Sequence, residues 1–253
     1  GHVQRGGKPS AYDRWMSTLL GYTAAREVLT ATPDSEPHII AERHNRIKRL
    51  PLMEHVRATQ NVATLIKDGD YLGAVEARGS SFGQMLEIFE TMSMPPLPEP
   101  TTDGEADAGA GTTRRRRVAI VHAGGLAPGM NTAARAAVRL GLDRGLTMLG
   151  IEGGFPGLLD GDVHELSWGD VEGWVGEGGA ALGTRREVPT VEQLYALGRA
   201  IEQHEIDALL VIGGFNAYLA ANKLVTERDR YPAFRIPIVC VPSSIDNNLP
   251  GSE

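Results

Sequence analysis

The segment from Val118 to Arg139, VAIVHAGGLAPGMNTAARAAVR, limits the fold of this chain more than any other. Its first four residues are apolar and mostly β-branched, which is typical of a short buried strand. Glycines 124 and 125 follow, and then an alanine-rich stretch that predicts a helix with Asn131 or Thr132 as its cap. A strand, a glycine turn and a helix N-terminus together present backbone N–H groups to an anion. The pattern therefore predicts an anion-binding loop, although a tight connection that binds nothing has the same pattern.

The residues that follow alternate between strand-like and helix-like patterns, as a parallel sheet requires. In an open parallel sheet, the loops at the carboxyl ends of the strands converge on one crevice. Strands are expected at 118–121, 146–151, 206–212 and 236–241, and helices at 168–174, 191–205 and 218–225. The residues expected in the crevice are Gly124, Gly125, Arg186, Gly213, Gly214 and Asp246.

An arginine and a carboxylate beside glycine loops suit a phosphorylated ligand and proton transfer from a hydroxyl group. The dinucleotide fingerprint G-x-G-x-x-G and the Walker A motif are both absent from the sequence. An NAD-linked oxidoreductase and a P-loop enzyme are therefore disfavoured.

The residues before 95 predict a separate, mainly helical region. Helices are expected from Ser10 or Asp13 to Leu29, and at 52–67, 71–78 and 81–91, with a hairpin at 38–50. Phe82, Leu86 and Phe89 are expected to pack inward. His38, His44 and His55 lack the neighbouring cysteines or paired carboxylates of a metal site, so none is assigned to them.

The composition changes abruptly at Pro95. Residues 101–113 contain only glycine, alanine, threonine and acids, which cannot bury enough apolar area to offset the entropy of ordering. This predicts a flexible linker. The run Arg114–Arg117 is expected to be its solvated end, and a nucleic-acid patch or a localisation signal is the alternative.

The overall composition favours a soluble, cytoplasmic protein. The net charge of -7 argues against nucleic acid as the main partner, and the single cysteine, Cys240, excludes a disulfide within the chain. No apolar run approaches the roughly 18 residues of a membrane span, so no membrane is expected. The chain opens without a methionine and closes on a loop, which suggests a piece of a longer protein.

Five ordered motifs together resemble those of the ATP-dependent 6-phosphofructokinase family. The segment 124–131 is similar to the nucleotide loop GGDAPGMN of that family, and 183–186 to its GT[SK]R loop. The remaining motifs are 213–218, a variant of GGDGSY, then 244–248, which resembles TIDND, and 1–7, which is similar to GHxQRGG. The resemblance implies a three-layer α/β/α, Rossmann-like fold with a mostly parallel sheet.

The order of these motifs resembles the duplicated, eukaryotic type of the family. GHxQRGG, which comes late in one kinase unit, here precedes the nucleotide loop. The chain would then contain two partial domains, the end of a catalytic half (1–94) and the start of a regulatory half (117–253), joined by a linker (95–116). The family transfers the γ-phosphate of ATP, with Mg²⁺, to fructose 6-phosphate in the committed step of glycolysis, and a homo-oligomer, a tetramer by resemblance, is implied.

The resemblance also assigns roles to residues. His2 and Arg5 match fructose 6-phosphate ligands, and Asp246 matches the general base. Leu126 and Phe215 stand where a catalytic half has acids, so no metal site and no working catalysis are expected in the second half. A sugar bisphosphate effector such as fructose 2,6-bisphosphate is expected at Arg186 and the loop Ser244, Ile245, Asp246, Asn247 and Asn248. Gly124, Gly125, Gly213 and Gly214 would be remnants of the nucleotide loops. Arg135 and Arg139 match effector contacts of bacterial relatives, or they are solvated helix arginines.

Two hypotheses stay open. The chain contributes to a phosphotransferase, or it is only a ligand-binding regulatory module, and allosteric small molecules are expected partners in both. Taken alone, the chain is expected to be inactive, since both halves are incomplete.

Overall fold

The computed structural model of the chain describes residues 7–43, 46–96, 114–246 and 249, with only the backbone described at Ser80 and Phe82. The chain separates into two compact units, Gly1–Glu87 (unit 1) and Ile88–Glu253 (unit 2). Each unit is described by itself.

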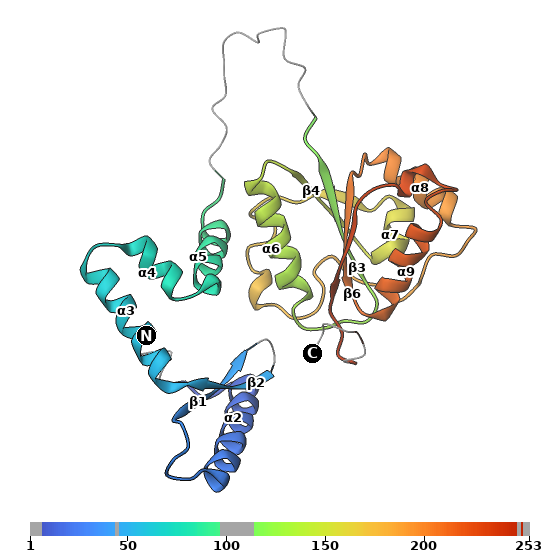
Figure 1. Cartoon of the computed structure of the whole chain (residues 1–253). Coiled ribbons are helices and arrows are strands. Elements are labelled where there is room, and N and C mark those ends of the chain that lie inside the picture. The colour runs from blue at the N-terminus through green and yellow to red at the C-terminus, as the bar shows by residue number, and fades with distance from the viewer. Residues whose placement is uncertain (1–6, 44–45, 97–113, 247–248, 250–253) are drawn as a thin grey trace, which may run out of the picture. The chain divides into compact units, whose positions relative to one another are not determined.

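Unit 2 is built on a five-stranded sheet of the described residues, in the order β5-β4-β3-β6-β7 (Figure 1). Strand β3 is parallel to both of its neighbours, β6 is parallel to β7, and β5 alone runs antiparallel, against β4. The predicted mostly parallel sheet is confirmed. The strands are β3 (Arg117–Ala123), β4 (Thr147–Ile151), β5 (Val163–Glu165), β6 (Ala208–Gly213) and β7 (Ile238–Pro242).

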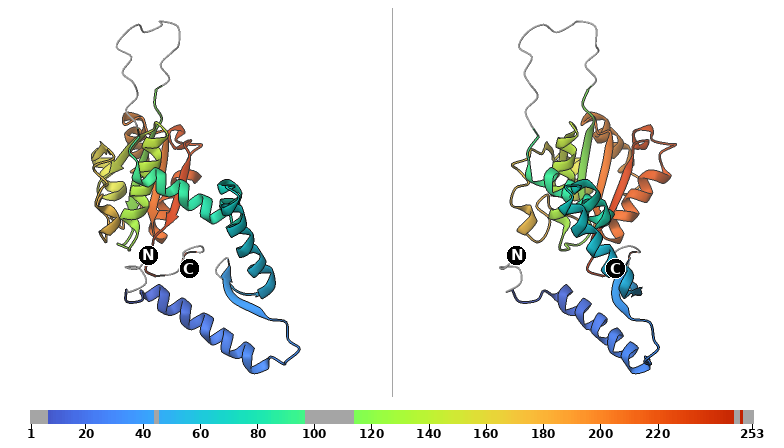
Figure 2. Two further views of the ribbon diagram at one scale, coloured as in Figure 1. Left: turned by 90° about the vertical axis from the view of Figure 1, so that its left-hand side faces the viewer. Right: turned by 60° about the vertical axis from the view of Figure 1, so that its left-hand side comes forward.

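Helices cover both faces of this sheet (Figures 1 and 2). Alternate residues of β3 point to opposite faces, as the pleat dictates. Ala119 and Val121 are buried with α7 (Gly154–Asp160), α8 (Leu194–Gln203) and α9 (Phe215–Thr226). Ile120 is buried on the other face with α6 (Met130–Asp143). The predicted three-layer α/β/α architecture is confirmed, and its two apolar layers are the main source of stability in unit 2.

The structure corrects several expected elements of unit 2. The helix expected at 168–174 is wrong, because turns occupy these residues before the short 3-10 helix η1 (Trp174–Gly176). The segment 152–159, where neither a strand nor a helix is expected, contains α7. Neither expected residue caps α6, whose N-cap is Gly129 with a left-handed φ of 92°. The side chain of Asn131 is buried and instead binds the backbone at 177, 178 and 181.

The arginine run before β3 is not simply a solvated linker end. Both carboxylate oxygens of Asp207 are bound, one by the Arg114 guanidinium and one by the Arg117 amide, each at 2.7 Å. Burial by itself would raise the pKa of the Asp207 carboxyl, but these contacts outweigh it and lower the pKa from its ordinary value. The Arg117 guanidinium also binds Glu165 at 3.0 Å. These ion pairs fasten the start of β3 to the residue that precedes β6 and to β5, which lies beyond β4 in the sheet.

Unit 1 contains the elements that the sequence predicts. They are α2 (Ala11–Thr30), the antiparallel hairpin of β1 (His38–Arg43) and β2 (Arg46–Pro51), α3 (Leu52–Lys67), α4 (Tyr71–Ala77) and most of α5 (Ser80–Ser93), which runs on into unit 2. Ser10 caps α2 in a capping box with Asp13.

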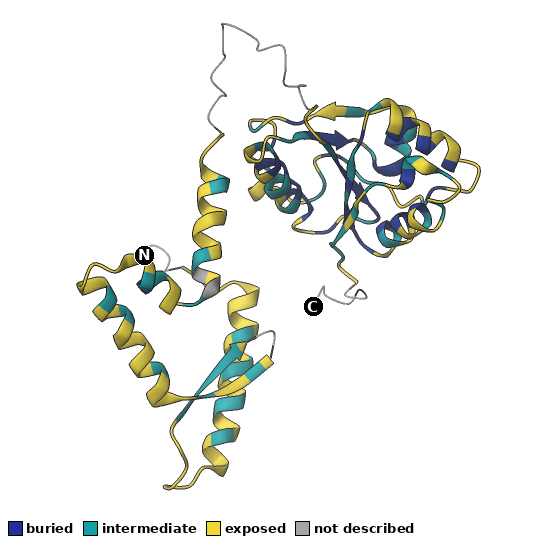
Figure 3. Ribbon diagram, turned by 45° about the horizontal axis from the view of Figure 1, so that its top comes forward, coloured by how far each residue is buried: buried dark blue, intermediate teal, exposed yellow. Residues whose placement is uncertain are grey.

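Unit 1 buries little of its own surface (Figure 3). Ala74 is its one buried residue among those that the structure describes. The inward packing expected of Leu86 and Phe89 is wrong, because both side chains are exposed. Within the described part of the chain, no helix is both long and apolar enough to span a bilayer.

Candidate functional site

A cavity of about 280 Å³ lies at the carboxyl ends of β3, β6 and β7. Its walls come from four loops that are far apart in the sequence. The described residues that line it are Gly124, Gly125, Leu126, Arg186, Gly214, Phe215, Asn216, Ser243, Ser244, Ile245 and Asp246. The structure thus brings together the residues that the sequence assigns to the crevice, with Gly213 directly before them.

Backbone contacts hold the first two loops together. The N–H of Gly124, whose φ of 104° favours glycine, donates to the carbonyl of Arg185 at 2.8 Å. The Thr184 hydroxyl donates to the carbonyl of Gly124 at 3.0 Å, and Ala123 forms a parallel bridge with Arg185. The loop that carries Arg186 is therefore attached to the end of β3.

The other two loops join this arrangement through Gly213. A Cβ at this position would lie 1.9 Å from the carbonyl oxygen of Ala123, so only glycine allows β3 and β6 to approach this closely. The Gly213 carbonyl accepts from the N–H of Ser243 at 3.0 Å. The Asn216 side chain donates to the carbonyl of Arg186 at 2.8 Å. Four loops thus form one connected rim around the cavity.

The rim offers a cation and a helix N-terminus to an anion. The Arg186 side chain is exposed, and it forms no hydrogen bond or ion pair with another described residue. It lies beside Gly125, where an added Cβ would be 3.3 Å from the Arg186 Nη2. Helix α9 begins at Phe215 on the same rim, and its free N–H groups and dipole favour negative charge.

The rim also carries hydroxyl groups and one carboxylate. The Asp246 N–H donates to the Ser244 hydroxyl at 3.1 Å, which fixes this short turn after β7. The Asp246 carboxylate is exposed, and no ion pair joins it to another described residue. It is therefore free to accept a hydrogen bond from a ligand hydroxyl.

Two apolar side chains line the cavity where the resemblance would require acids. Leu126 is 60% exposed and Phe215 is 54% exposed, so both present hydrocarbon to whatever enters. Magnesium is bound through hard oxygen ligands, often carboxylates with phosphates and water, and Asp246 is the one carboxylate among the described lining residues. The described residues hold no cluster of three or more histidine, cysteine or acidic side chains. The two positions that the resemblance assigns to acids therefore offer magnesium no oxygen ligand from a side chain.

Other expected site residues lie elsewhere. Arg135 and Arg139 do not line the cavity but bind the carbonyl of Met92 on α5. His2, Arg5, Asn247 and Asn248 lie outside the described residues.

One polar residue near the site, His122, was not predicted from the sequence. His122 is fully buried on β3 directly before the glycine loop, and neither ring nitrogen has a hydrogen-bond partner among the described residues. Burial lowers the pKa of His122 to about 4, although the Met130 backbone partly offsets this effect. Its polarity within an apolar strand was the available signal.

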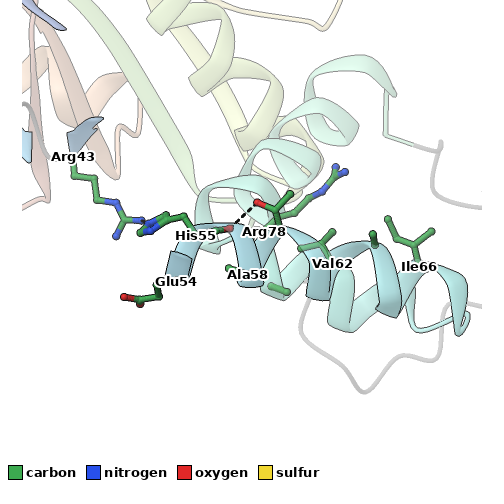
Figure 4. A pocket seen from close by; sticks show the side chains of 10 residues that line it. Arg43, Glu54, His55, Ala58, Val62, Ile66 and Arg78 are labelled. Atoms are coloured by element: carbon green, nitrogen blue, oxygen red, sulfur yellow. Dashed lines mark hydrogen bonds between the residues drawn. The ribbon is translucent and has the colours of Figure 1, made fainter. Parts of the chain in front are cut away.

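A larger hollow of about 590 Å³ lies along α3 in unit 1 (Figure 4). The side chains of Ala58, Val62 and Ile66 supply its apolar wall, while Arg43 contacts His55 at 3.4 Å. No strand ends or glycine loop converge on it among the described residues, so it lacks the anion-binding features of the cavity in unit 2.

Comparisons with known proteins agree on one family. The phosphofructokinase family model matches residues 117–253. The chain is 42% identical to the ATP-dependent 6-phosphofructokinase of Aspergillus fumigatus, an alignment that covers 100% of this chain and 31% of that protein. It is 39% identical to the platelet-type ATP-dependent 6-phosphofructokinase of Rattus norvegicus, and this alignment also covers 100% of this chain and 31% of that protein.

A solved structure of phosphofructokinase from Saccharomyces cerevisiae matches with a TM-score of 0.85 and 36% identity, over 100% of this chain and 33% of that chain. The chain therefore spans about a third of the length of these relatives. The matched family model covers the five-stranded sheet, helices α6 to α9 and all the loops that form the cavity. The chain belongs to the phosphofructokinase family.

Proposed function

We propose that the chain acts as part of an ATP-dependent 6-phosphofructokinase, which transfers the γ-phosphate of ATP to the 1-hydroxyl of fructose 6-phosphate. The products are fructose 1,6-bisphosphate and ADP. The family assignment and the names of the most similar relatives support this proposal. Magnesium and ATP would bind in parts of the enzyme other than the cavity of unit 2, because Leu126 and Phe215 stand there in place of expected acids.

The proposal includes the expected division of the chain. Residues 1–94 would belong to a catalytic half, 95–116 to a linker and 117–253 to a regulatory half. His2 and Arg5 would bind fructose 6-phosphate in the catalytic half. A homo-oligomer that acts in the cytoplasm and responds to allosteric ligands is the setting we propose for the whole enzyme.

For the cavity of unit 2 we propose a sugar bisphosphate as effector, with fructose 2,6-bisphosphate as the first candidate. One phosphate would bind the Arg186 guanidinium, whose planar donors match phosphate oxygens. The N-terminus of α9 would favour the same charge. Asp246 and Ser244 would accept and donate hydrogen bonds to the sugar hydroxyls.

The observation that carries this proposal is the combination of Arg186, which has no ion-pair partner among the described residues, with apolar side chains at Leu126 and Phe215. The arginine favours an anion, while the apolar pair leaves Asp246 as the one carboxylate among the described lining residues. The cavity of about 280 Å³ is just below the roughly 300 Å³ at which small-molecule pockets usually begin, so it favours a compact ligand. Asp246 would hold a sugar hydroxyl here without a phosphoryl group to transfer.

Replacement of Arg186 tests this site. The variant Arg186→Gln should bind fructose 2,6-bisphosphate about 10- to 100-fold more weakly, which corresponds to the loss of a hydrogen bond to a charged group. Arg199→Gln is the matched control, because Arg199 is an exposed arginine on α8 that pairs only with Glu202 at 3.6 Å among the described residues. Isothermal titration of the whole chain measures both. Equal affinity in the two variants would contradict the assignment of Arg186.

An enzyme assay separates the regulatory reading from a catalytic one. Residues 1–253 with Mg–ATP and fructose 6-phosphate should give no measurable ADP. Turnover by this chain would contradict the proposal that unit 2 binds without catalysis. In a longer active enzyme that contains this chain, Asp246→Ser should leave turnover in place, and its loss would show that Asp246 is a working base.

A further inference from the structure

Helix α5 ends with a carbonyl group that the backbone of the helix and of the residues just after it cannot bind. In an α-helix the carbonyl of residue i accepts from the N–H of residue i+4, or of i+3 in a tighter last turn. For Met92 these residues are Pro96 and Pro95, and proline has no N–H. The helix ends at Ser93, so a donor for the Met92 carbonyl has to come from water or from another part of unit 2.

Two arginines of α6 provide that donor. Arg135 Nη2 donates to the Met92 carbonyl at 3.4 Å, and Arg139 Nη1 donates to the same oxygen in a closer contact. The two arginines are four residues apart, so they lie on one face of α6 and reach one point together. Both positive groups also face the negative end of the α5 dipole.

Arg139 is held in place for this contact. It is only 4% exposed, and its guanidinium lies 4.2 Å from the centre of the Trp168 ring. Glu172, which is mostly exposed, lies 3.8 Å from Arg139 Nη2. Burial, and then the charge of Arg135, lower the pKa of Arg139, while Glu172 raises it. A guanidinium fixed between an aromatic ring and a carboxylate loses little further entropy when it binds a carbonyl.

We propose that Arg135 and Arg139 form a latch that holds the last turn of α5 against α6, so that a helix carbonyl occupies the place expected for an anionic effector. The contact is intramolecular and within unit 2. Helix α6 follows directly from the glycine loop of the cavity. The latch therefore connects the end of α5, which precedes residues 97–113 in the sequence, with the helix that follows this loop of the candidate site.

Hydrogen exchange of the whole chain, followed by mass spectrometry, tests the latch. In Arg139→Gln, the amides of residues 88–94 should exchange about 10-fold faster or more, because the last turn of α5 frays without its partner. Amides of β3 and β6 should keep the wild-type rate. Arg199→Gln is the control and should change neither region. Unchanged exchange at 88–94 in a folded Arg139→Gln protein would overturn the proposal.

Two further measurements keep the test decisive. If Arg139→Gln does not fold, Arg135→Gln takes its place, with a smaller but measurable acceleration because its contact is longer. Inorganic phosphate at millimolar concentration should leave the exchange of residues 88–94 in the wild-type chain unchanged, since the carbonyl already occupies the arginines. Acceleration by phosphate would show that the pair is an anion site and would overturn the latch.

Discussion

The two units of the chain stabilise their helices in different ways. In unit 2, α6, α7, α8 and α9 have no side-chain cap, yet all four contribute buried residues to the layers around the sheet. In unit 1, Ser10 and Asp70 cap α2 and α4 with their side chains, while Ala74 is the one described residue that is buried. Tertiary packing thus holds unit 2, and local contacts contribute much of what holds unit 1. The cavity lies in the unit that can keep its loops rigid.

The largest expected effect comes from removing the same side chain in each unit. Leu197 on α8 is 0% exposed and Leu72 on α4 is 80% exposed. Leu197→Ala should lower the free energy of unfolding of unit 2 by about 2–5 kcal/mol, through lost burial and a cavity. Leu72→Ala should change the stability of unit 1 by less than about 0.5 kcal/mol.

Urea denaturation followed by circular dichroism and by limited proteolysis, which assigns each transition to a unit, measures this pair. If the two substitutions lowered the free energy of unfolding by comparable amounts, unit 1 would also depend on buried apolar side chains. The contrast between the two units would then be wrong.

The second effect is a pH response confined to unit 2. The pKa of His122 is about 4 in the folded chain, against about 6.5 when it is exposed. Between these values the unfolded state binds the additional proton, so stability falls as the pH is lowered. From pH 7 to pH 5 unit 2 should lose about 2 kcal/mol through this residue. Denaturation midpoints at the two pH values provide the measurement.

His122→Gln cannot take up the proton and should lose this part of the pH dependence. His164→Gln, on exposed β5, is the control and should keep it. An unchanged pH dependence in His122→Gln would show that His122 is not responsible.

The smallest effect sharpens the description of unit 1. Ser10 accepts from the amide of Asp13 at 3.2 Å, and the Asp13 carboxylate accepts from the Ser10 amide at 2.8 Å. Ser10→Ala should cost about 1 kcal/mol and fray the start of α2. Ser17→Ala, an exposed change inside the same helix, should be neutral or slightly stabilising. Hydrogen-exchange rates of the amides of residues 11–14 distinguish the two variants. Equal rates in both would show that the Ser10 cap does not stabilise the start of α2.

Much of the fold was predictable because the patterns are local. The apolar runs at β3, β4, β6 and β7 are short and bounded by glycine or proline, and the capping box at Ser10 is a contiguous signal. The crevice residues followed from one topological rule about parallel strands.

The errors came from information that is not local. Helix α7 contains Pro156 in its first turn and two glycines, and it lies between left-handed Gly153 and Gly161, so its composition resembled a loop. An added Cβ at Gly157 would lie 1.5 Å from the carbonyl of Glu152, a requirement that only the folded chain reveals. Likewise, nothing near Arg139 in the sequence indicates that its partner is the carbonyl of Met92.

The central claim is that the cavity of unit 2 takes a sugar bisphosphate and not a magnesium–nucleotide complex. Isothermal titration of the unmodified chain with fructose 2,6-bisphosphate and, separately, with Mg–ATP compares the two ligands directly. Saturable binding of the sugar bisphosphate, at least about 10-fold tighter than any binding of Mg–ATP, is the predicted result, and about 1.4 kcal/mol separates the two ligands at that ratio. Tighter binding of Mg–ATP than of fructose 2,6-bisphosphate would contradict it.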